Sequence, residues 1–290
     1  MQLIEPKFEI LSMPDGEEAL AMLERIGRTA YKSEGKIDSG VDPCPACMVI
    51  DGVDDTALEP CSTCMTCHAT GVVRSREPSS HRFVKMLLGA EKKAKMLASA
   101  QAQLRQASVD GVGDDEAAEE LVASVVQYTR DNPPHESVIE HCSASVLLTA
   151  NRGVTHEIVR HRIASFTQES TRYCDYDASK FGGQIAVIKR NLPPEVEAKC
   201  AVGWLAEWRA AMQDAERHYR ELRRMGVPPQ FARDVLNNAL KSDIVMTANF
   251  REWRHFFAMR CSPNAHPDMR QLSVPLRDEF RRRIPIIFDD

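Results

Sequence analysis

Apolar side chains recur every three or four positions along much of the chain, which is the spacing of one face of an α-helix. In the longest such stretch, residues 196–225, the apolar stripe consists of Trp204, Trp208, Met212, Ala215, Tyr219 and Leu222. We interpret this stripe as core or subunit interface rather than as a cofactor-binding surface. Similar patterns predict further helices at 17–29, 81–107, 116–130, 155–163, 228–233, 249–259 and 269–284, the last with a break or restart at Pro275.

Three shorter stretches have the composition of β-strands, at 143–150, 185–188 and 243–248. The first is followed by Asn151-Arg152-Gly153, which predicts a turn, and Thr155 is then expected to be the N-cap of a helix that runs through Ile163. Residues 165–173 follow as a loop, where ligand-binding groups commonly lie. The mixture of helices and strands indicates the α+β class.

The composition changes abruptly between residues 37 and 76, where cysteine and turn-forming residues replace the apolar pattern. Two Cys-x-x-Cys pairs in this stretch are spaced as in zinc ribbons, because zinc takes four cysteine or histidine ligands in a tetrahedron. We favour Cys44, Cys47, Cys64 and Cys67 as the ligands, with Cys61 as the alternative. The second pair and the next histidine also match a haem-attachment pattern, which we regard as accidental. A disordered loop without metal is the other reading of this stretch.

Charge and overall composition exclude several classes of protein. With 290 residues, 43% hydrophobic and 27% charged, the chain resembles an ordinary globular protein. No apolar run approaches the roughly 20 residues of a membrane span, and the first residues lack the features of an export signal, so we expect a cytoplasmic protein with no membrane partner. The net charge of −5 argues against a general nucleic-acid binder.

A dense group of polar side chains runs from Arg160 to Tyr173, in the order Arg-His-Arg-Ile-Ala-Ser-Phe-Thr-Gln-Glu-Ser-Thr-Arg-Tyr. Guanidinium groups match phosphate oxygens in pairs, and the amide and hydroxyl groups can bind the edge of a heterocycle. An Arg-x-Arg alone is more often a solvated helix face. This longer pattern favours an anionic ligand rich in heteroatoms.

This stretch resembles the signature of the flavin-dependent thymidylate synthases, in which Arg-His-Arg is followed after seven residues by a serine and then Arg-Tyr. The resemblance extends upstream to His-Glu-Ser-Val-Ile-Glu-His at 135–141. Downstream it includes Gln-Phe-Ala-Arg at 230–233, Asn-Phe-Arg at 249–251, Arg260 and His266. The family implies a single catalytic domain over 1–290, with a central, mostly antiparallel sheet flanked by helices. The Cys-rich element at 37–76 and a helical segment at 89–119 are then insertions.

The resemblance implies conversion of dUMP to dTMP, with methylenetetrahydrofolate as carbon donor, FAD as cofactor and NADPH as reductant. It also implies a homotetramer with active sites shared between subunits. The residues that would bind dUMP are Glu157, Gln168, Glu169, Ser170, Thr171, Arg172, Arg233 and Arg260. Those that would bind FAD are His135, Ser137, Arg160, His161, Arg162, Ile163, Asn249, Arg251, His255 and His266.

Three of these residues are expected to be catalytic by the same resemblance. Ser170 would hydrogen-bond the uracil rather than act as a nucleophile, because no His–Asp relay is evident beside it. Arg260 would bind the uracil carbonyls and polarise the ring, and His135 would lie near the reactive nitrogen of the flavin. Arg233 would hold the phosphate or sugar of dUMP.

The sequence departs from the family pattern at several polar positions. His156-Glu157 stands where many relatives have Arg-Gln, which puts a flavin contact there in doubt. Gln168 replaces a frequent Glu, His255 a common Asn and Asn237 a common Pro. Each of these positions remains polar, and none removes the proposed centre. Two other functions stay open: an FAD and NADPH oxidoreductase without methyl transfer, and a non-enzymatic zinc-ribbon protein that binds nucleotides or nucleic acid.

Overall fold

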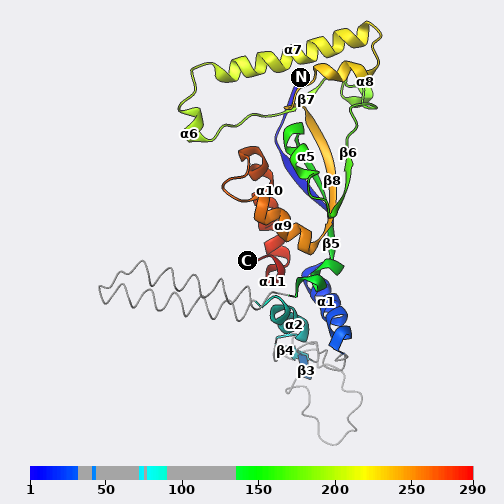
Figure 1. Cartoon of the computed structure of the whole chain (residues 1–290), viewed down its shortest axis with the longest axis vertical. Helices are drawn as coiled ribbons and strands as arrows, with labels where there is room; N and C mark the ends of the chain where they lie inside the picture. Colours follow the sequence, from blue (N-terminus) through cyan, green and yellow to red (C-terminus); the bar gives the residue numbers. More distant parts are fainter. Residues whose placement is uncertain (32–40, 44–71, 75–76, 90–134, 290) are drawn as a thin grey trace, which may run out of the picture. The chain divides into compact units, whose positions relative to one another are not determined.

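A computed structural model describes residues 1–31, 41–43, 72–74, 77–89 and 135–289 (Figure 1). These residues belong to two compact units, one made of Met1–Pro14 and Glu140–Phe288 and the other of Asp15–Ile139 and Asp289–Asp290. The cysteines expected to bind zinc, and all but the first residue of the inserted segment at 89–119, lie outside the described residues. The single catalytic domain over 1–290 stays a prediction.

In chain order the elements are β1 (Gln2–Ile4), β2 (Lys7–Ser12), α1 (Gly16–Tyr31), β3 (Val41–Pro43), β4 (Val72–Arg74), α2 (Ser79–Leu87), η2 (Glu136–His141), β5 (Ser143–Asn151), α5 (Arg152–Ile158), β6 (Ala164–Gln168), η3 (Ser179–Phe181), β7 (Ala186–Ile188), α6 (Pro194–Glu197), α7 (Trp204–Arg224), α8 (Pro229–Ala232), η4 (Arg233–Val235), β8 (Lys241–Asn249), α9 (Phe250–Arg260), α10 (Pro267–Arg283) and α11 (Pro285–Phe288).

An antiparallel sheet of order β2-β5-β8-β6 forms the centre of the first unit. Side chains alternate across it, and Ile244, Met246 and Ala248 of β8 are buried with Val146 and Leu148 of β5. Helices α5, α9 and α10 contact these strands, so the apolar face of the sheet is covered by helix. The predicted antiparallel sheet is therefore confirmed, and β1 and β7 add a short parallel pair beside it.

An aromatic cluster on the C-terminal helices completes this core. Trp253 of α9 is fully buried, and its indole N–H donates to the Ala144 carbonyl of β5 at 3.1 Å. Phe256, Phe257 and Phe280 surround the indole at ring distances of 5.2 to 5.8 Å. Edge-to-face and tilted contacts of this kind are favourable because of the ring quadrupole. They fix α9 and α10 against the sheet.

Two asparagines convert strands into helices. Asn151 ends β5, and its side-chain oxygen accepts the Val154 N–H at 2.8 Å, while Asn249 ends β8 and accepts the Glu252 N–H at 2.8 Å. Both are N-caps. The prediction of Thr155 as N-cap was wrong, because Asn151 precedes it and the Thr155 hydroxyl donates to the Arg152 carbonyl.

The structure corrects the ends of several predicted helices. Helix α5 stops at Ile158, so the Arg-His-Arg follows the helix instead of extending it. Helix α7 begins at Trp204, after Gly203 with a φ of 96°, so residues 196–203 belong to the end of α6 and the turns that follow it. Helix α10 continues through Pro275 without a break. The predicted loop at 165–173 is in part strand β6, because Ala164–Gln168 pair with β8.

The second unit includes helices α1 and α2, which pack on each other. Phe83 lies against Gly27, where an added Cβ would be only 2.5 Å from the ring, so glycine is needed for this close approach. The Ser79 hydroxyl donates to the buried Glu24 carboxylate at 2.7 Å. Strands β3 and β4 pair antiparallel, which joins the two ends of the Cys-rich stretch.

Candidate active site

A cavity of about 810 Å³ opens in the first unit between the turn after α5 and one face of α9. Glu252, His255 and Met259 recur at helical spacing and form one wall. The residues that line it are Glu157, Arg160, His161, Arg162, Ile163, Glu252, His255, Met259 and Arg260. We call it the basic cavity, because three arginines face two carboxylates within it.

Arg260 is connected to a buried histidine. Its Nε donates to His161 Nε2 at 3.1 Å, and a guanidinium can only donate, so Nε2 carries no proton. Nδ1 must then hold the proton and donate it to Glu252 at 2.8 Å. Burial of the ring lowers the pKa of His161 even though the Glu252 hydrogen bond raises it. His161 is therefore a neutral support that orients Arg260.

Glu157 holds the other side of the same guanidinium. Arg260 Nη1 donates to the Glu157 carboxylate at 3.0 Å, and Nη2 donates to the Glu157 carbonyl oxygen at 2.9 Å. All three nitrogens of Arg260 are thus engaged by its own chain, which fixes the plane of the group. The N–H groups that remain can bind a ligand in a set direction.

The rim of the basic cavity is exposed and cationic. Arg160 and Arg162 are exposed on the turn between α5 and β6, and Ile163 beside them is 69% exposed. His255 is exposed on the opposite wall, with its ring 5.5 Å from that of His161. This combination suits an anion with a flat apolar part.

One group of possible metal ligands also lies here. Among the described residues, ligand atoms of His161, Glu252 and His255 lie within 4.8 Å of one another. Both ring nitrogens of His161 are already hydrogen-bonded, to Glu252 and Arg260. A cation would have to break these bonds beside a guanidinium, so the geometry favours an anionic ligand.

A second group of the expected residues lies at the other end of β6. Arg233 Nη1 donates to the hydroxyl of the buried Thr171 at 2.9 Å. The Ser170 hydroxyl accepts the Arg172 N–H at 3.3 Å, and its carbonyl accepts the N–H groups of Tyr173 and Cys174. Arg172 itself is exposed, with its guanidinium 5.3 Å from the centre of the Tyr173 ring. We call residues 170–177 the Ser170 loop.

Glu169 and Gln168 point into the protein just before this loop. Glu169 accepts hydrogen bonds from Lys241 at 2.9 Å and from the Tyr176 hydroxyl at 3.0 Å. The Gln168 amide donates to the hydroxyls of Thr155 and Ser242. Both side chains anchor the loop in this structure. The pKa of Tyr176 lies well above its usual value, chiefly because the ring is buried and secondly because the Glu169 carboxylate is close to it.

Several residues expected to bind FAD have structural partners. Asn249 caps α9, and His266 Nδ1 accepts the Asp268 N–H at 3.2 Å at the start of α10. Arg251 pairs with Glu140 at 2.6 Å on the surface. His135 and Ser137 belong to the second unit and are exposed there.

The expected residues of the first unit thus form two groups, separated by strand β6. Five residues of strand carry the backbone about 13 Å. Among the described contacts, Arg260 bonds to Glu157 and His161, whereas Ser170 and Thr171 belong with Arg172 and Arg233. Within the part of the chain that the structure describes, no hydrogen bond joins Arg260 directly to Ser170, Arg172 or Arg233.

Comparison with known proteins identifies the family of this chain. The family model described as "Thymidylate synthase complementing protein" matches residues 83–286, well over half of the 290 residues. The chain belongs to this family. The matched stretch contains all the residues that the sequence predicted for dUMP and FAD.

Relatives in the thymidylate synthase complementing family are named flavin-dependent thymidylate synthase. The one from Geobacter sulfurreducens is 37% identical over 183 residues, which is 62% of this chain and 75% of the relative. The one from Pyrococcus abyssi is 32% identical over 150 residues, 51% of this chain and 59% of the relative. The aligned residues therefore make up 51 to 62% of this chain and 59 to 75% of the two relatives.

A solved structure shares the fold at low sequence identity. The crystal structure of a UMP/dUMP methylase PolB from Streptomyces cacaoi, bound with 5-Br dUMP, aligns with a TM-score of 0.58 and 15% identity. The alignment covers 100% of this chain and 96% of that chain. The α+β architecture is thus shared with a known structure.

None of the helices in the described ranges is long and apolar enough to span a membrane.

The family signature does not identify the residues that hold the site in place. Two residues outside the signature make such contacts. Glu252 bonds to His161, and Lys241 bonds to Glu169, although each lies more than 70 residues further along the chain than its partner. Each is one charged residue among many, and no local pattern marks it. The nearest signal is the alternation in β8, which places Lys241 on the half-buried face of the sheet.

Proposed function

We propose that the protein is a flavin-dependent thymidylate synthase that converts dUMP to dTMP. Methylenetetrahydrofolate is the one-carbon donor, and FAD reduced by NADPH is the source of hydride. The observation that carries the proposal is Arg260, held by Glu157 and His161 inside a cavity whose rim carries Arg160 and Arg162. Family membership supports the same conclusion.

The basic cavity has the groups that FAD requires. The exposed guanidiniums of Arg160 and Arg162 match the oxygens of a diphosphate, and Ile163 and Met259 offer apolar surface to a flat ring system. When bound there, FAD supplies the hydride for the new methyl group. The chain's own contribution is to bind and orient the cofactor and to keep cationic charge beside it.

For dUMP we propose a division of roles between the two groups. Arg260 binds the uracil carbonyls and stabilises negative charge on the ring, since its orientation is fixed in advance. Ser170 and Arg172 hold the nucleotide, and Arg233 binds its phosphate or sugar. His135 remains our proposal for a group near the flavin.

We further propose that each active site uses two chains of a homotetramer. Arg260 and the Ser170 loop lie at opposite ends of β6 and form separate clusters. A nucleotide that contacts both is accommodated if one chain provides Arg260 and a neighbour provides Ser170, Arg172 and Arg233. Closed symmetric assemblies repeat such a shared site at every equivalent interface.

Tritium release tests this function directly. The purified protein with FAD, NADPH and methylenetetrahydrofolate should release tritium from C5-labelled dUMP, because methylation replaces the C5 hydrogen. Omission of FAD and NADPH should stop the release. NADPH oxidation that leaves dUMP unchanged would instead establish the oxidoreductase alternative. A protein that fails in both assays but binds nucleic acid with a steep salt dependence would support the non-enzymatic alternative.

We propose a structural zinc ion in the Cys-rich stretch, bound by Cys44, Cys47, Cys64 and Cys67, with Cys61 as the alternative ligand. Support comes from the spacing and from the β3–β4 pairing at the ends of the stretch. We expect about one zinc per chain by metal analysis, lost in Cys44→Ser and kept in Cys200→Ser. A metal-free protein with full activity and a full folding transition would contradict it.

A further inference from the structure

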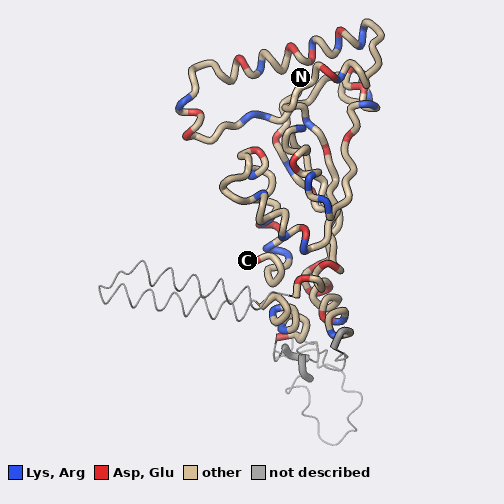
Figure 2. The backbone as a smooth tube through the Cα atoms, in the orientation of Figure 1, with Lys and Arg blue, Asp and Glu red and all other residues tan. Residues whose placement is uncertain are grey.

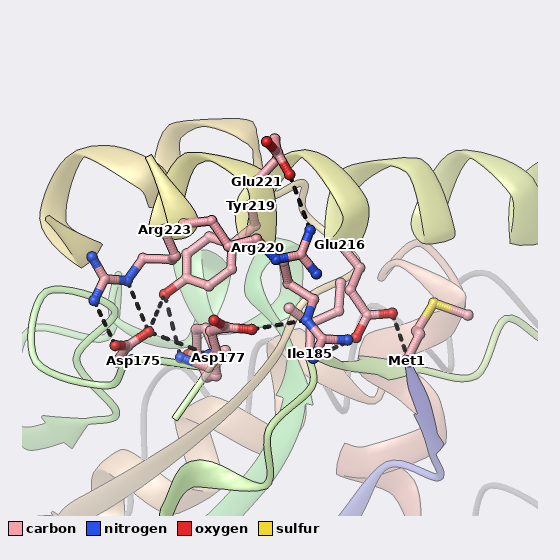
Figure 3. Close-up of polar contacts among 11 residues, drawn as sticks. Met1, Asp175, Asp177, Ile185, Glu216, Tyr219, Arg220, Glu221 and Arg223 are labelled. Carbon is pink, nitrogen blue, oxygen red and sulfur yellow. Dashed lines mark hydrogen bonds and ion pairs between the residues drawn. The ribbon is translucent and has the colours of Figure 1, made fainter. Parts of the chain in front are cut away.

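One arginine on α7 lies close to the Ser170 loop although no motif includes it. Arg223 donates from Nε to Asp175 Oδ1 at 3.0 Å and from Nη2 to Asp175 Oδ2 at 2.7 Å (Figure 3). This is a bidentate pair, the geometry in which a guanidinium holds a carboxylate most firmly. Asp175 stands three residues after Arg172. The pair therefore fixes the end of the loop that carries Ser170 and Arg172.

The same guanidinium also holds the segment that leads to Arg233. Arg223 Nη1 donates to the Val227 carbonyl at 2.5 Å. Val227 follows Gly226, whose φ of 86° turns the chain out of α7 and into α8 and η4, where Arg233 lies. Figure 1 shows α7 beside α8 at this end of the sheet. One side chain thus connects the backbone on both sides of the Thr171–Arg233 hydrogen bond.

Tyr219, one turn earlier on α7, strengthens this connection from the core. Its side chain is fully buried, and its hydroxyl donates to Asp175 Oδ1 at 3.3 Å and accepts the Tyr176 N–H at 3.3 Å. Burial raises the pKa of Tyr219 to about 12, so the hydroxyl keeps its proton at neutral pH. Arg220 adds a contact to Asp177 at 2.8 Å.

The contacts of Arg223 differ from those of Arg217 and Arg224, two arginines of α7 that pair within the helix. Both acidic and basic residues are distributed along this helix (Figure 2). Arg224 and Arg217 pair with Glu221 and Asp214 on the exposed surface of α7 itself, and such pairs contribute little. The Arg223 side chain is only 21% exposed and reaches 48 residues back along the sequence.

We propose that Arg223, acting with Asp175 and Tyr219, is a positioning residue that sets the separation between Ser170 and Arg172 on one side and Arg233 on the other. This inference rests on the proposed function, because it assumes that these groups bind dUMP together. Arg223 would act through its contacts with Asp175 and the Val227 carbonyl, rather than as a ligand of the nucleotide itself. Groups that are held in the bound arrangement in advance bind more tightly than groups that must first be ordered, so loss of this support should weaken dUMP binding.

The test compares Arg223→Gln with Arg224→Gln in the FAD-loaded protein. Arg223→Gln should raise the KM for dUMP by about tenfold, with kcat changed less than twofold and FAD content unchanged, while Arg224→Gln should match the wild type. Arg223→Lys should recover part of the loss. Asp175→Asn should raise the KM similarly, and the loss in the double variant should be smaller than the two single losses combined, because both changes break the same Arg223–Asp175 pair.

Four further outcomes bear on the inference and on the proposed function. An unchanged KM in a folded Arg223→Gln protein would overturn it, and so would an equal fall of kcat with loss of FAD. If Arg223→Gln fails to fold, Tyr219→Phe keeps the buried ring and must still weaken dUMP binding. Equilibrium binding of dUMP, measured alongside tritium release, distinguishes a failure of the Arg223 inference from a failure of the proposed function. A wild-type protein that binds dUMP without releasing tritium contradicts the proposed function. The role of Arg223 is then tested by comparing the dUMP affinities of Arg223→Gln and Arg224→Gln.

Discussion

Replacing Arg260 with alanine is expected to lower the rate of dTMP formation by roughly 10²–10³-fold, the usual effect of removing one preorganised donor. The guanidinium is oriented before any ligand binds, by His161 on one side and Glu157 on the other. Its removal eliminates the cationic group proposed to stabilise charge on the uracil. Single-turnover measurement with pre-reduced flavin checks the chemical step directly.

FAD should remain bound to the Arg260→Ala protein, because Arg160 and Arg162 still form the rim of the basic cavity. The yellow colour and the flavin-to-protein ratio measure this. Arg260→Lys should recover little activity, since an ammonium group cannot reproduce the planar fork. Arg270→Ala, a change at an exposed position of α10, serves as the matched control. Loss of flavin with Arg260→Ala would mean that Arg260 is a cofactor ligand instead.

Much of the fold can be predicted because the buried face of a strand or helix requires apolar residues at a regular spacing in the sequence. Strand β8 buries every second residue from Ser242 to Ala248, and β5 does so from Ala144 to Leu148, so the predicted ends of both strands lie within one or two residues of the observed ends. Strand β6 was missed because it contains little apolar surface of its own. It is a strand because β8 offers it a partner, which is a tertiary effect.

The helix boundaries failed for a local reason. Asn151 and Thr155 are both good N-cap residues, and the sequence alone does not say which is used. Asn151 is the N-cap in the structure, so the helix begins about one turn earlier than predicted. It ends at Ile158, and the Arg-His-Arg lies after the helix. That shift changes the site, because Arg160 and Arg162 then lie on an exposed turn at the mouth of the cavity.

The structure gives two of the residues expected to bind FAD a structural contact that the family pattern did not indicate. Asn249 and His266 occupy the places the family pattern gives them, but here their side chains cap helices. Histidine and asparagine perform both tasks with the same atoms, so a motif cannot separate them. The partners that fix Arg260 and the Ser170 loop, such as Glu252 and Arg223, are distant in sequence and became visible only through contacts.

Mixing two inactive variants is expected to restore activity if each site takes Arg260 from one chain and Arg233 from another. Neither Arg260→Ala nor Arg233→Ala should support dTMP formation alone. In a randomly mixed tetramer, a site works when its first chain retains Arg260 and its second retains Arg233, which is true of about a quarter of the sites. Co-expression with two different affinity tags and double purification gives the mixed assembly to assay.

The comparison that decides this prediction uses pairs of variants from one group. Arg260→Ala mixed with Glu157→Ala affects the same cluster, so a shared site built from two chains predicts no recovery if each change is inactivating alone. Recovery with the first pair and none with the second would assign the two clusters to different chains. If the first pair stays inactive although mixed tetramers form, both clusters must act from one chain, and β6 would have to bring its two ends to the same nucleotide.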